Sequence, residues 1–506
     1  MKRVEYLLLL LILIGAFSVR LYRFGSPVAD WHSWRQADTS AVSRNFINHG
    51  FDVLHPKFDD LSNVPSGLDN PNGYRFVEFP IYNVFQAGLY QLIGIFTLEE
   101  WGRLVNIFSA VLSTLFIYLL VRKYANNLAA LLAAFFFALL PFNIYFGRTI
   151  LPDPMMVMAI LGGTFFFDLW LDKSGLRNLK SETNSKFKIQ NSKLQFKVQN
   201  CLFFILSIIF TASSFLLKPY ALFFTLPMIY LAWKAFGFKA LIKWQLWIFA
   251  IITISPLIFW RFWILQYPEG IPASGWLFNG GNIRFKPSFF YWIFADRIGR
   301  EILGYWGLPV FVFGILSLGA KFKEYNLKKS GFLVSFLISS LLYLFIIARG
   351  NVQHDYYQIL IIPAIAIFLG IGGEFLIKIS KEYFSRIISY ALFCICAVFM
   401  LFFGWYNVRN LFNLNYPIVS AGVAVDKLIP KDAKVIAINE GDTSFLYQTK
   451  RKGWASFEKD LPVMIKMGAD YLILPNPKKP DFNIGKEYKI VSYSVDYILF
   501  DLNQKP

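Results

Sequence analysis

The stretch from Asp30 to Asn45 holds the densest group of side chains able to do chemistry. It reads Asp-Trp-His-Ser-Trp-Arg-Gln-Ala-Asp-Thr-Ser-Ala-Val-Ser-Arg-Asn and carries two Asp, two Arg, one His and two Trp. From Trp34 to Phe46 the apolar residues recur at helical spacing, which leaves Arg35, Asp38 and Arg44 off the apolar face. The pattern predicts a helix that offers a proton-accepting carboxylate beside cations. The alternative is a helix that only anchors the chain at the lipid–water boundary.

Further ionisable residues fall in four later segments that adjoin long apolar runs. They are Glu78 in Glu-Phe-Pro-Ile-Tyr, Arg148 and Asp153 in Gly-Arg-Thr-Ile-Leu-Pro-Asp-Pro, Lys218 in Lys-Pro-Tyr, and Arg349, His354, Asp355 and Tyr357 in Arg-Gly-Asn-Val-Gln-His-Asp-Tyr-Tyr. A carboxylate can take a proton from a hydroxyl, and cations bind phosphate strongly. If these segments meet at one membrane face, they suit a reaction between a lipid phosphate and a polar acceptor.

The composition is that of a membrane protein. Of 506 residues, 56% are hydrophobic and only 16% are charged, whereas soluble proteins carry about a quarter charged residues. Repeated apolar runs of roughly twenty residues predict a polytopic α-helical fold. The net charge of +18 is explained by basic inner loops, so no nucleic-acid partner is predicted. The three cysteines lie in apolar runs and indicate neither disulfides nor a thiolate metal site.

We expect about eleven membrane spans. They are placed at residues 5–21, 101–121, 128–147, 155–171, 201–217, 219–235, 245–264, 302–320, 331–348, 357–377 and 387–404. The apolar run after Met1-Lys2-Arg3 has no small-residue cleavage site, so it is interpreted as a retained span rather than a signal peptide. Lys/Arg-rich loops alternate along the chain, which places the N-terminus in the cytoplasm and the C-terminus outside.

The segments outside the spans divide into three kinds. Residues 22–100 form the first outer loop, in which 81–96 is too short and polar for a span and is interpreted as an interfacial helix. Residues 176–200 contain a polar, basic near-repeat and are expected to be a loop insertion. Residues 405–506 alternate strand-like and helical patterns, with strands expected at 434–438, 470–474, 488–493 and 497–502 and helices near 418–428 and 457–467. The chain is thus predicted to have a transmembrane domain (1–404) and a small extracytoplasmic α/β domain (405–506).

Four motifs resemble those of a known enzyme group. They are Trp34-Arg-Gln-Ala-Asp38, Glu78-Phe-Pro-Ile-Tyr82, Arg148 to Asp153 and His354-Asp-Tyr-Tyr357. In this order they resemble bacterial relatives of the protein O-mannosyltransferase and aminoarabinose-transferase group, which are C-type membrane glycosyltransferases (family 39-like). The resemblance covers roughly residues 1–410. It implies a polyprenyl-phosphate-linked sugar as donor and transfer on the non-cytoplasmic side of a bacterial plasma membrane.

The resemblance and the residue types suggest a single displacement at the anomeric carbon. Asp38 is the preferred base, but several relatives begin the first-loop helix with Asp-Glu where this chain has Arg35-Gln36. Asp30 and Glu78 therefore remain rival bases. Asp153 is expected to assist the base or position the acceptor, unless it only caps a helix. Candidate groups for the donor phosphate are Arg44, Lys218, Arg349 and Tyr357, and further site candidates are Arg35, Arg148, His354 and Asp355.

Other functions remain open at the level of sequence. A lipid-linked glycan flippase or another transporter would place ionisable residues at mid-depth in the membrane, and the predicted spans are almost free of them. An oligosaccharide polymerase or ligase would differ only in its acceptor. No cofactor is predicted, although His354-Asp355 offers two ligand types for a divalent metal. The acceptor can be a protein, a lipid or a glycan.

Overall fold

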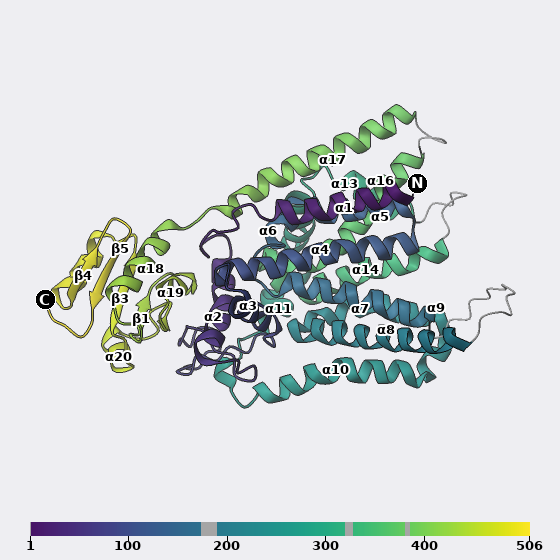
Figure 1. Cartoon of the computed structure of the whole chain (residues 1–506). Helices are drawn as coiled ribbons and strands as arrows, with labels where there is room; N and C mark the ends of the chain where they lie inside the picture. Colours follow the sequence, from purple (N-terminus) through teal and green to yellow (C-terminus); the bar gives the residue numbers. More distant parts are fainter. Residues whose placement is uncertain (1, 174–189, 319–326, 380–384) are drawn as a thin grey trace.

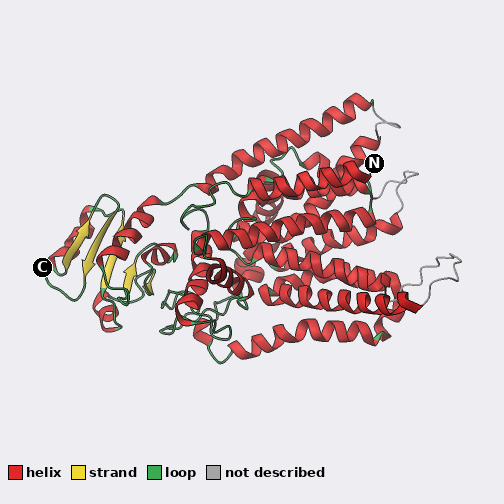
Figure 2. Ribbon diagram, in the orientation of Figure 1, coloured by secondary structure: helices red, strands yellow, loops and turns green. Residues whose placement is uncertain are grey.

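Long helices make up most of the protein, and the strands are confined to the C-terminal end (Figures 1 and 2). The computed structural model describes residues 2–173, 190–318, 327–379 and 385–506. The α-helices before residue 409 are α1 (Lys2–Val19), α2 (Ser33–His49), α3 (Ile81–Ile93), α4 (Leu98–Tyr124), α5 (Asn127–Leu139), α6 (Pro141–Phe146), α7 (Asp153–Lys173), α8 (Gln190–Leu217), α9 (Leu226–Phe236), α10 (Trp244–Ile264), α11 (Trp276–Asn279), α12 (Pro287–Phe290), α13 (Leu308–Leu316), α14 (Leu327–Ile346), α15 (Ala348–Gln353), α16 (Ile362–Ile379) and α17 (Arg386–Val408). Segments of 3₁₀-helix include η1 (Pro219–Thr225) and η6 (Asp355–Ile361), and η5 (Tyr291–Ile302) is a π-helix.

Within the described ranges, seven helical stretches are long and apolar enough to cross a membrane. They are Leu98–Tyr124, Asp153–Asp172, Gln199–Leu217, Pro219–Ile242, Trp244–Ile264, Asp355–Lys378 and Arg386–Leu428. Shorter apolar helices lie at Asn127–Leu139 and Gly331–Ile346. The polytopic helical class is therefore confirmed, while the number of eleven spans stays a prediction.

Local sequence explains how the central helices begin and pack. Thr97 caps α4 through a reciprocal capping box with Glu100. Most of α16 is buried in the bundle, and glycines allow its close contact with α13. A Cβ added to Gly372 would lie 1.9 Å from the carbonyl oxygen of Val310, and one on Gly314 would lie 2.0 Å from that of Phe368. Small residues at such crossings bring helix backbones together in membranes.

Three helix boundaries differ from the sequence prediction. The expected span at 128–147 divides into α5 and α6, because Pro141 has no amide hydrogen and Leu140 before it adopts an extended ψ of 121°. In the expected span at 302–320, η5 ends at Ile302, a turn with positive φ at Gly304 follows, and α13 covers Leu308–Leu316, while residues 319–320 lie outside the described residues. In the expected insertion at 176–200, α8 already begins at Gln190, so the loop prediction is wrong for 190–200. Residues 176–189 lie outside the described residues.

The C-terminal residues form a five-stranded sheet. Its strands β1 (Val435–Ala437), β2 (Gly453–Trp454), β3 (Tyr471–Pro475), β4 (Lys489–Tyr493) and β5 (Tyr497–Asp501) lie in the order β2-β1-β3-β5-β4. β1 is parallel to both of its neighbours, whereas β5 is antiparallel to β3 and β4. Four strands match the predicted ones, and β2 was not predicted because it has only two residues.

Alternating side chains of the sheet pack against helices on both of its faces. Val435 and Ala437 share a core with α18 (Tyr416–Leu428) and α19 (Ser444–Thr449), while Ile436 faces the core that contains Met464 of α20 (Leu461–Lys466). The first outer loop joins the edge of this sheet, because Asp60 pairs with Gly453 in a parallel bridge. The sheet is thus held against the same loop that leads from α2 to α3. The proposed domain boundary at residue 404 stays a prediction, since α17 continues to Val408.

Candidate functional site

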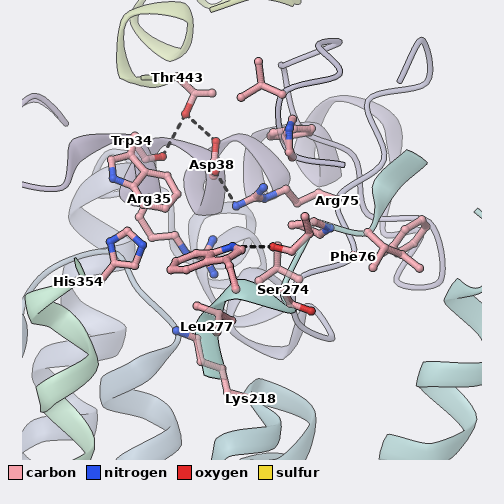
Figure 3. Close-up of a pocket in the computed structure, with 18 of the residues that line it drawn as sticks. Trp34, Arg35, Asp38, Arg75, Phe76, Lys218, Ser274, Leu277, His354 and Thr443 are labelled. Atoms are coloured by element: carbon pink, nitrogen blue, oxygen red, sulfur yellow. Dashed lines mark hydrogen bonds and ion pairs between the residues drawn. The ribbon is translucent and has the colours of Figure 1, made fainter. Parts of the chain in front are cut away.

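A cavity of about 430 Å³ lies where the helical bundle meets the first outer loop and the C-terminal segment (Figure 3). Its ionisable lining residues are Arg35, Asp38, Asp60, Arg75, Lys218, Arg261 and His354. Its aromatic lining residues are Trp34, Phe58, Phe76, Tyr220, Trp276, Phe278, Tyr356 and Tyr357. The cavity therefore combines a few charged groups with a largely aromatic wall, as small-molecule sites commonly do.

Helix α2 supplies three of the lining residues and is unusual because both its apolar and its polar faces are buried. It begins after His32, which has a left-handed backbone with φ of 52°, and ends before Gly50 with φ of 91°. Several of its polar side chains bond to neighbouring elements; for example, Ser43 donates a hydrogen bond to Gln86 of α3 at 2.8 Å. A helix that lay on the membrane surface would expose its polar face. The burial of this face favours a site over a simple anchor.

Asp38 faces the cavity with both carboxylate oxygens engaged. Arg75 forms an ion pair with one oxygen at 2.6 Å, and the Thr443 hydroxyl donates to the other at 2.6 Å. Burial raises the pKa of Asp38, while Arg75 and Thr443 oppose that rise. Because each carboxylate oxygen has a second lone pair, the group retains the capacity to accept a proton from a bound hydroxyl.

Glu78 lies behind Arg35 rather than in the cavity wall. One guanidinium nitrogen of Arg35, Nη2, contacts both carboxylate oxygens of Glu78 at 2.6 and 2.9 Å. The other terminal nitrogen, Nη1, is buried and has no hydrogen-bond partner among the residues that the structure describes. Glu78 therefore orients Arg35, and Arg35 keeps an unused donor at a lining position.

Lys218 and Asp153 form a second buried pair. Pro219 forces Lys218 out of the helical conformation, to φ of −158° and ψ of 134°, at the junction between α8 and η1. The ammonium group lies 2.7 and 2.8 Å from the two oxygens of Asp153, the first residue of α7. It also lies 5.2 and 5.3 Å from the ring centroids of Tyr356 and Tyr357. Burial lowers the pKa of Lys218, and Asp153 acts against this shift.

Several predicted site residues lie outside the cavity wall. Asp30 pairs with Arg148 at 3.0 Å and accepts a hydrogen bond from Gln36 at 2.7 Å. Arg44 pairs with Asp59 and lies 4.1 Å from the ring centroid of Tyr447, so it joins α2 to the C-terminal segment. Arg349 packs its stem near Gly280 and is not among the lining residues.

His354 and Asp355 diverge although they are adjacent in sequence. Asp355 contacts Nε2 of His32 at 2.6 Å and accepts a hydrogen bond from Trp31 at 2.7 Å, which fixes the segment before α2. His354 lines the cavity, where burial and the nearby His32 lower its pKa to about 4. Its imidazole is therefore neutral near pH 7. Within the described ranges, no group of three or more His, Cys, Asp or Glu side chains is placed to hold a metal ion.

Three ionisable residues that line the cavity, and the contact between Thr443 and Asp38, were not predicted from the sequence. Arg75 and Asp60 lie in the first outer loop without a recognisable motif, and Arg261 lies near the end of α10. Thr443 is separated from Asp38 by 405 positions along the chain. The sequence signal for Arg75 and Asp60 is the composition of the first outer loop, which is rich in Asp and Arg.

The cavity has two chemically distinct ends. In Figure 3, Asp38, Arg75 and Thr443 lie together at one end, and Lys218 lies at the other, beside the helices of the bundle. One end thus offers a carboxylate that can accept a proton, and the other offers a cation for an anionic group. His354, Trp34 and Trp276 line the space as well.

Comparison with known proteins adds family and fold information. Residues 77–180 match the family model of dolichyl-phosphate-mannose-protein mannosyltransferases. The fold is similar to that of ArnT from Cupriavidus metallidurans in the apo state, with a TM-score of 0.61 and 11% identity over 98% of this chain and 97% of that chain. ArnT bound to undecaprenyl phosphate matches over the same shares with a TM-score of 0.57 and 11% identity. No curated protein matches the sequence.

A second enzyme shows the same fold. AglB, the oligosaccharyltransferase from Archaeoglobus fulgidus in complex with an inhibitory peptide and a dolichol-phosphate, matches over 94% of this chain and 69% of that chain, with a TM-score of 0.55 and 12% identity. The family match includes Glu78 and the segment from Arg148 to Asp153, and the fold similarity covers the remaining motifs. The chain therefore resembles the C-type membrane glycosyltransferases of the protein O-mannosyltransferase and aminoarabinose-transferase group, in sequence over residues 77–180 and in fold over nearly its whole length.

Proposed function

We propose that this protein transfers a sugar from a polyprenyl-phosphate-linked donor to a hydroxyl of an acceptor on the non-cytoplasmic face of the membrane. The observation that carries the proposal is the polarity of the cavity, in which Asp38 and Lys218 lie at opposite ends. The similarity to ArnT, which has been crystallised with undecaprenyl phosphate, supports a lipid-linked donor. The predicted topology, in which the Lys/Arg-rich loops are cytoplasmic, supports an outer position for the cavity.

The proposed reaction is a single displacement with inversion. Asp38 accepts the proton of the acceptor hydroxyl, whose oxygen forms a bond to the anomeric carbon. The bond between that carbon and the phosphate oxygen breaks, and polyprenyl phosphate leaves from the opposite face of the sugar. Lys218 and the free Nη1 of Arg35 stabilise the departing phosphate. Tyr357 lies beside Lys218 and serves as a further hydrogen-bond donor.

The buried carboxylates behind the cations have a positioning role in this scheme. Glu78 holds Arg35, and Asp153 holds Lys218, each through two oxygens of one carboxylate. These contacts keep both cations in place before the donor binds, so little reorganisation is needed in the transition state. We infer that Glu78 and Asp153 act through the cations rather than as the base.

The placement of charge favours an enzyme over a transporter. In α4, α7, α10 and α16, ionisable residues lie within about two turns of a helix end. Transporters usually bind their substrates near the bilayer midplane, with ionisable groups at that depth.

Mass spectrometry of lipid-linked sugars and surface glycans from cells with the gene deleted and restored tests the proposal. Loss of one glycan with accumulation of its polyprenyl-phosphate donor is expected; an unchanged profile would contradict the proposed function.

Lys218→Ala is expected to weaken donor binding by about 10–100-fold, the effect of losing a charge-assisted contact worth about 1.5–3 kcal/mol. Competition by undecaprenyl phosphate in purified protein measures this loss. Asp153→Asn keeps the ammonium group but removes the carboxylate that positions it and supports its charge, so it should weaken donor binding less than Lys218→Ala does. Lys286→Ala is the matched control, because it alters an exposed lysine whose ammonium group donates to the Gly281 carbonyl at 2.8 Å and which does not line the cavity. Equal weakening by Lys218→Ala and Lys286→Ala would show that Lys218 has no specific contact with phosphate.

A further inference from the structure

Asp60 is a second carboxylate in the wall of the cavity, and the proposed reaction does not use it. Its side chain is buried, with 2% of the residue exposed. One oxygen accepts a hydrogen bond from the Ser62 amide at 3.0 Å, and the other accepts from the Ser62 hydroxyl at 2.7 Å. Within the described residues, no cation forms an ion pair with it. A buried carboxylate without a cation is costly to maintain in the folded protein.

The backbone fixes Asp60 at the edge of the C-terminal sheet. The Gly453 amide donates to the Asp59 carbonyl at 3.0 Å, and the Leu61 amide donates to the Gly453 carbonyl at 2.8 Å. These two bonds flank Asp60 and hold it in the parallel bridge to β2. Gly453 has φ of 158°, and a Cβ there would lie 1.8 Å from the Val435 carbonyl oxygen, so the strands approach closely at this point. The position of the carboxylate is therefore set by the sheet and not by a mobile loop.

The charges around Asp60 leave one negative charge uncompensated. Arg75 forms its ion pair with Asp38 at 2.6 Å, and it lies near Asp60 without pairing with it. Burial, with the carboxylates of Asp38 and Glu458 nearby, raises the pKa of Asp60 to about 7, although its hydrogen bonds to Ser62 oppose that shift. Asp60 thus lies near Asp38 and Arg75 in the cavity wall. Arg35 lies one helical turn from Asp38 but is paired with Glu78, and Lys218 lies toward the other end of the cavity.

We propose that Asp60 determines acceptor specificity, by accepting a hydrogen bond from a second hydroxyl or an amine of the acceptor and by disfavouring acceptors that are anionic at that position. The inference rests on the proposed function, because it assigns the acceptor to the Asp38 end of the cavity. A hydroxyl or ammonium donor would supply the partner that the carboxylate lacks, whereas an acceptor carboxylate or phosphate would meet two like charges. Asp60 is a binding group in this scheme, and the proton of the attacked hydroxyl still passes to Asp38.

Three small alcohols of different charge test the charge preference directly. Ethanolamine, ethylene glycol and glycolate are supplied as surrogate acceptors, with lipid-linked sugars extracted from gene-deleted cells as donor, and the release of polyprenyl phosphate is measured. At pH 8 the full-length wild-type protein should use ethanolamine at least about tenfold faster than glycolate, as expected for opposite and like charges in a partly buried site. Asp60→Asn should reduce this ratio toward one. Asp69→Asn, an exposed change in the same loop, should leave the ratio as in the wild type.

The pH dependence gives a second comparison. Near pH 5.5 Asp60 is protonated in the wild type, so the ratio should shrink toward that of Asp60→Asn. The ratio of Asp60→Asn should change less with pH than that of the wild type, because only Asp38 still titrates there. The charges of ethanolamine and glycolate are constant over this range. An identical ratio in wild type and Asp60→Asn at pH 8, or an equal loss in Asp69→Asn, would overturn the role of Asp60. Absence of polyprenyl phosphate release with all three alcohols would instead overturn the proposed function, and with it the acceptor site.

Thermal melting provides a readout that does not depend on activity. A carboxylate whose pKa is raised in the folded state destabilises the protein progressively as pH rises from the ordinary carboxyl range to about 7. Asp60→Asn removes this penalty. The melting temperature of the variant minus that of the wild type should therefore increase between pH 5 and pH 8. Asp60→Ser serves as a second variant in case the asparagine amide clashes with Ser62. If the melting temperatures of both variants differ from that of the wild type by the same amount at every pH in this range, Asp60 does not carry an uncompensated negative charge.

Discussion

Asp38→Asn is expected to lower turnover by about 10²–10⁴-fold, the usual contribution of a general base. The amide keeps the shape of the side chain and can still accept hydrogen bonds through its oxygen, but it cannot take the acceptor proton. Donor binding should persist, because Lys218 and Arg35 are unchanged. Turnover per folded molecule, with donor affinity measured in the same preparation, separates a lost base from a lost binding site.

The controls for Asp38 come from its own contacts. The substitution also weakens the ion pair with Arg75, so the melting temperature must be measured in parallel. Thr443→Val removes the hydroxyl that donates to Asp38 at 2.6 Å and to the Trp34 carbonyl at 3.2 Å, but it keeps the Asp38 carboxylate, so it should cause a smaller loss of turnover. Near-normal turnover of Asp38→Asn, together with a lower melting temperature, would show that Asp38 is structural and that α2 is an anchor.

The secondary structure was largely predictable because it depends on local pattern. Apolar runs of membrane length and period-two strands identify most helices and four of the five strands. The errors arise where backbone chemistry interrupts a continuous apolar run. Pro141 divides one expected span, and Gly304 with the π-helical segment before it replaces the start of another. Hydropathy alone does not register such interruptions.

The sequence predicted the site residues that lie in short sequence motifs, but it did not predict the contacts that they make with distant segments. The predicted site residues that line the cavity are Arg35, Asp38, Lys218, His354 and Tyr357. Their partners were not predictable, since Thr443 is brought to Asp38 by the docking of the C-terminal segment on the first outer loop. Arg44 illustrates the opposite case, because its spacing on α2 suggested phosphate binding, whereas the structure pairs it with Asp59.

The rival bases are separated by their surroundings. Asp30, Asp38 and Glu78 are all buried, so burial alone does not distinguish them. Only Asp38 lines the cavity; Glu78 supports Arg35 and Asp30 supports Arg148. The three carboxylates that the sequence left open as bases therefore differ in whether an acceptor in the cavity can reach them, and variants can test this difference.

Asp30→Asn is expected to lower the free energy of unfolding by about 3–5 kcal/mol, the usual cost of removing one partner from a buried ion pair. Arg148 would remain charged and buried, with its Nε without a partner and its Nη1 donating to the Arg23 carbonyl at 3.1 Å. Because Asp30 does not line the cavity, turnover per folded molecule should stay near that of the wild type. Thermal melting and turnover measured on the same samples check both statements.

The double variant Asp30→Asn/Arg148→Met provides the matched comparison for Asp30. Removing both charges takes away the unpaired guanidinium group, so the double variant should melt above Asp30→Asn alone. Asp69→Asn controls for the loss of one carboxylate at the surface, where it pairs with Lys459 at 2.7 Å. A large loss of turnover in Asp30→Asn at an unchanged melting temperature would identify Asp30 as the base in place of Asp38. The opposite result, lower stability with normal turnover, would establish the Asp30–Arg148 pair as the support that fixes the start of α2 against the turn before α7.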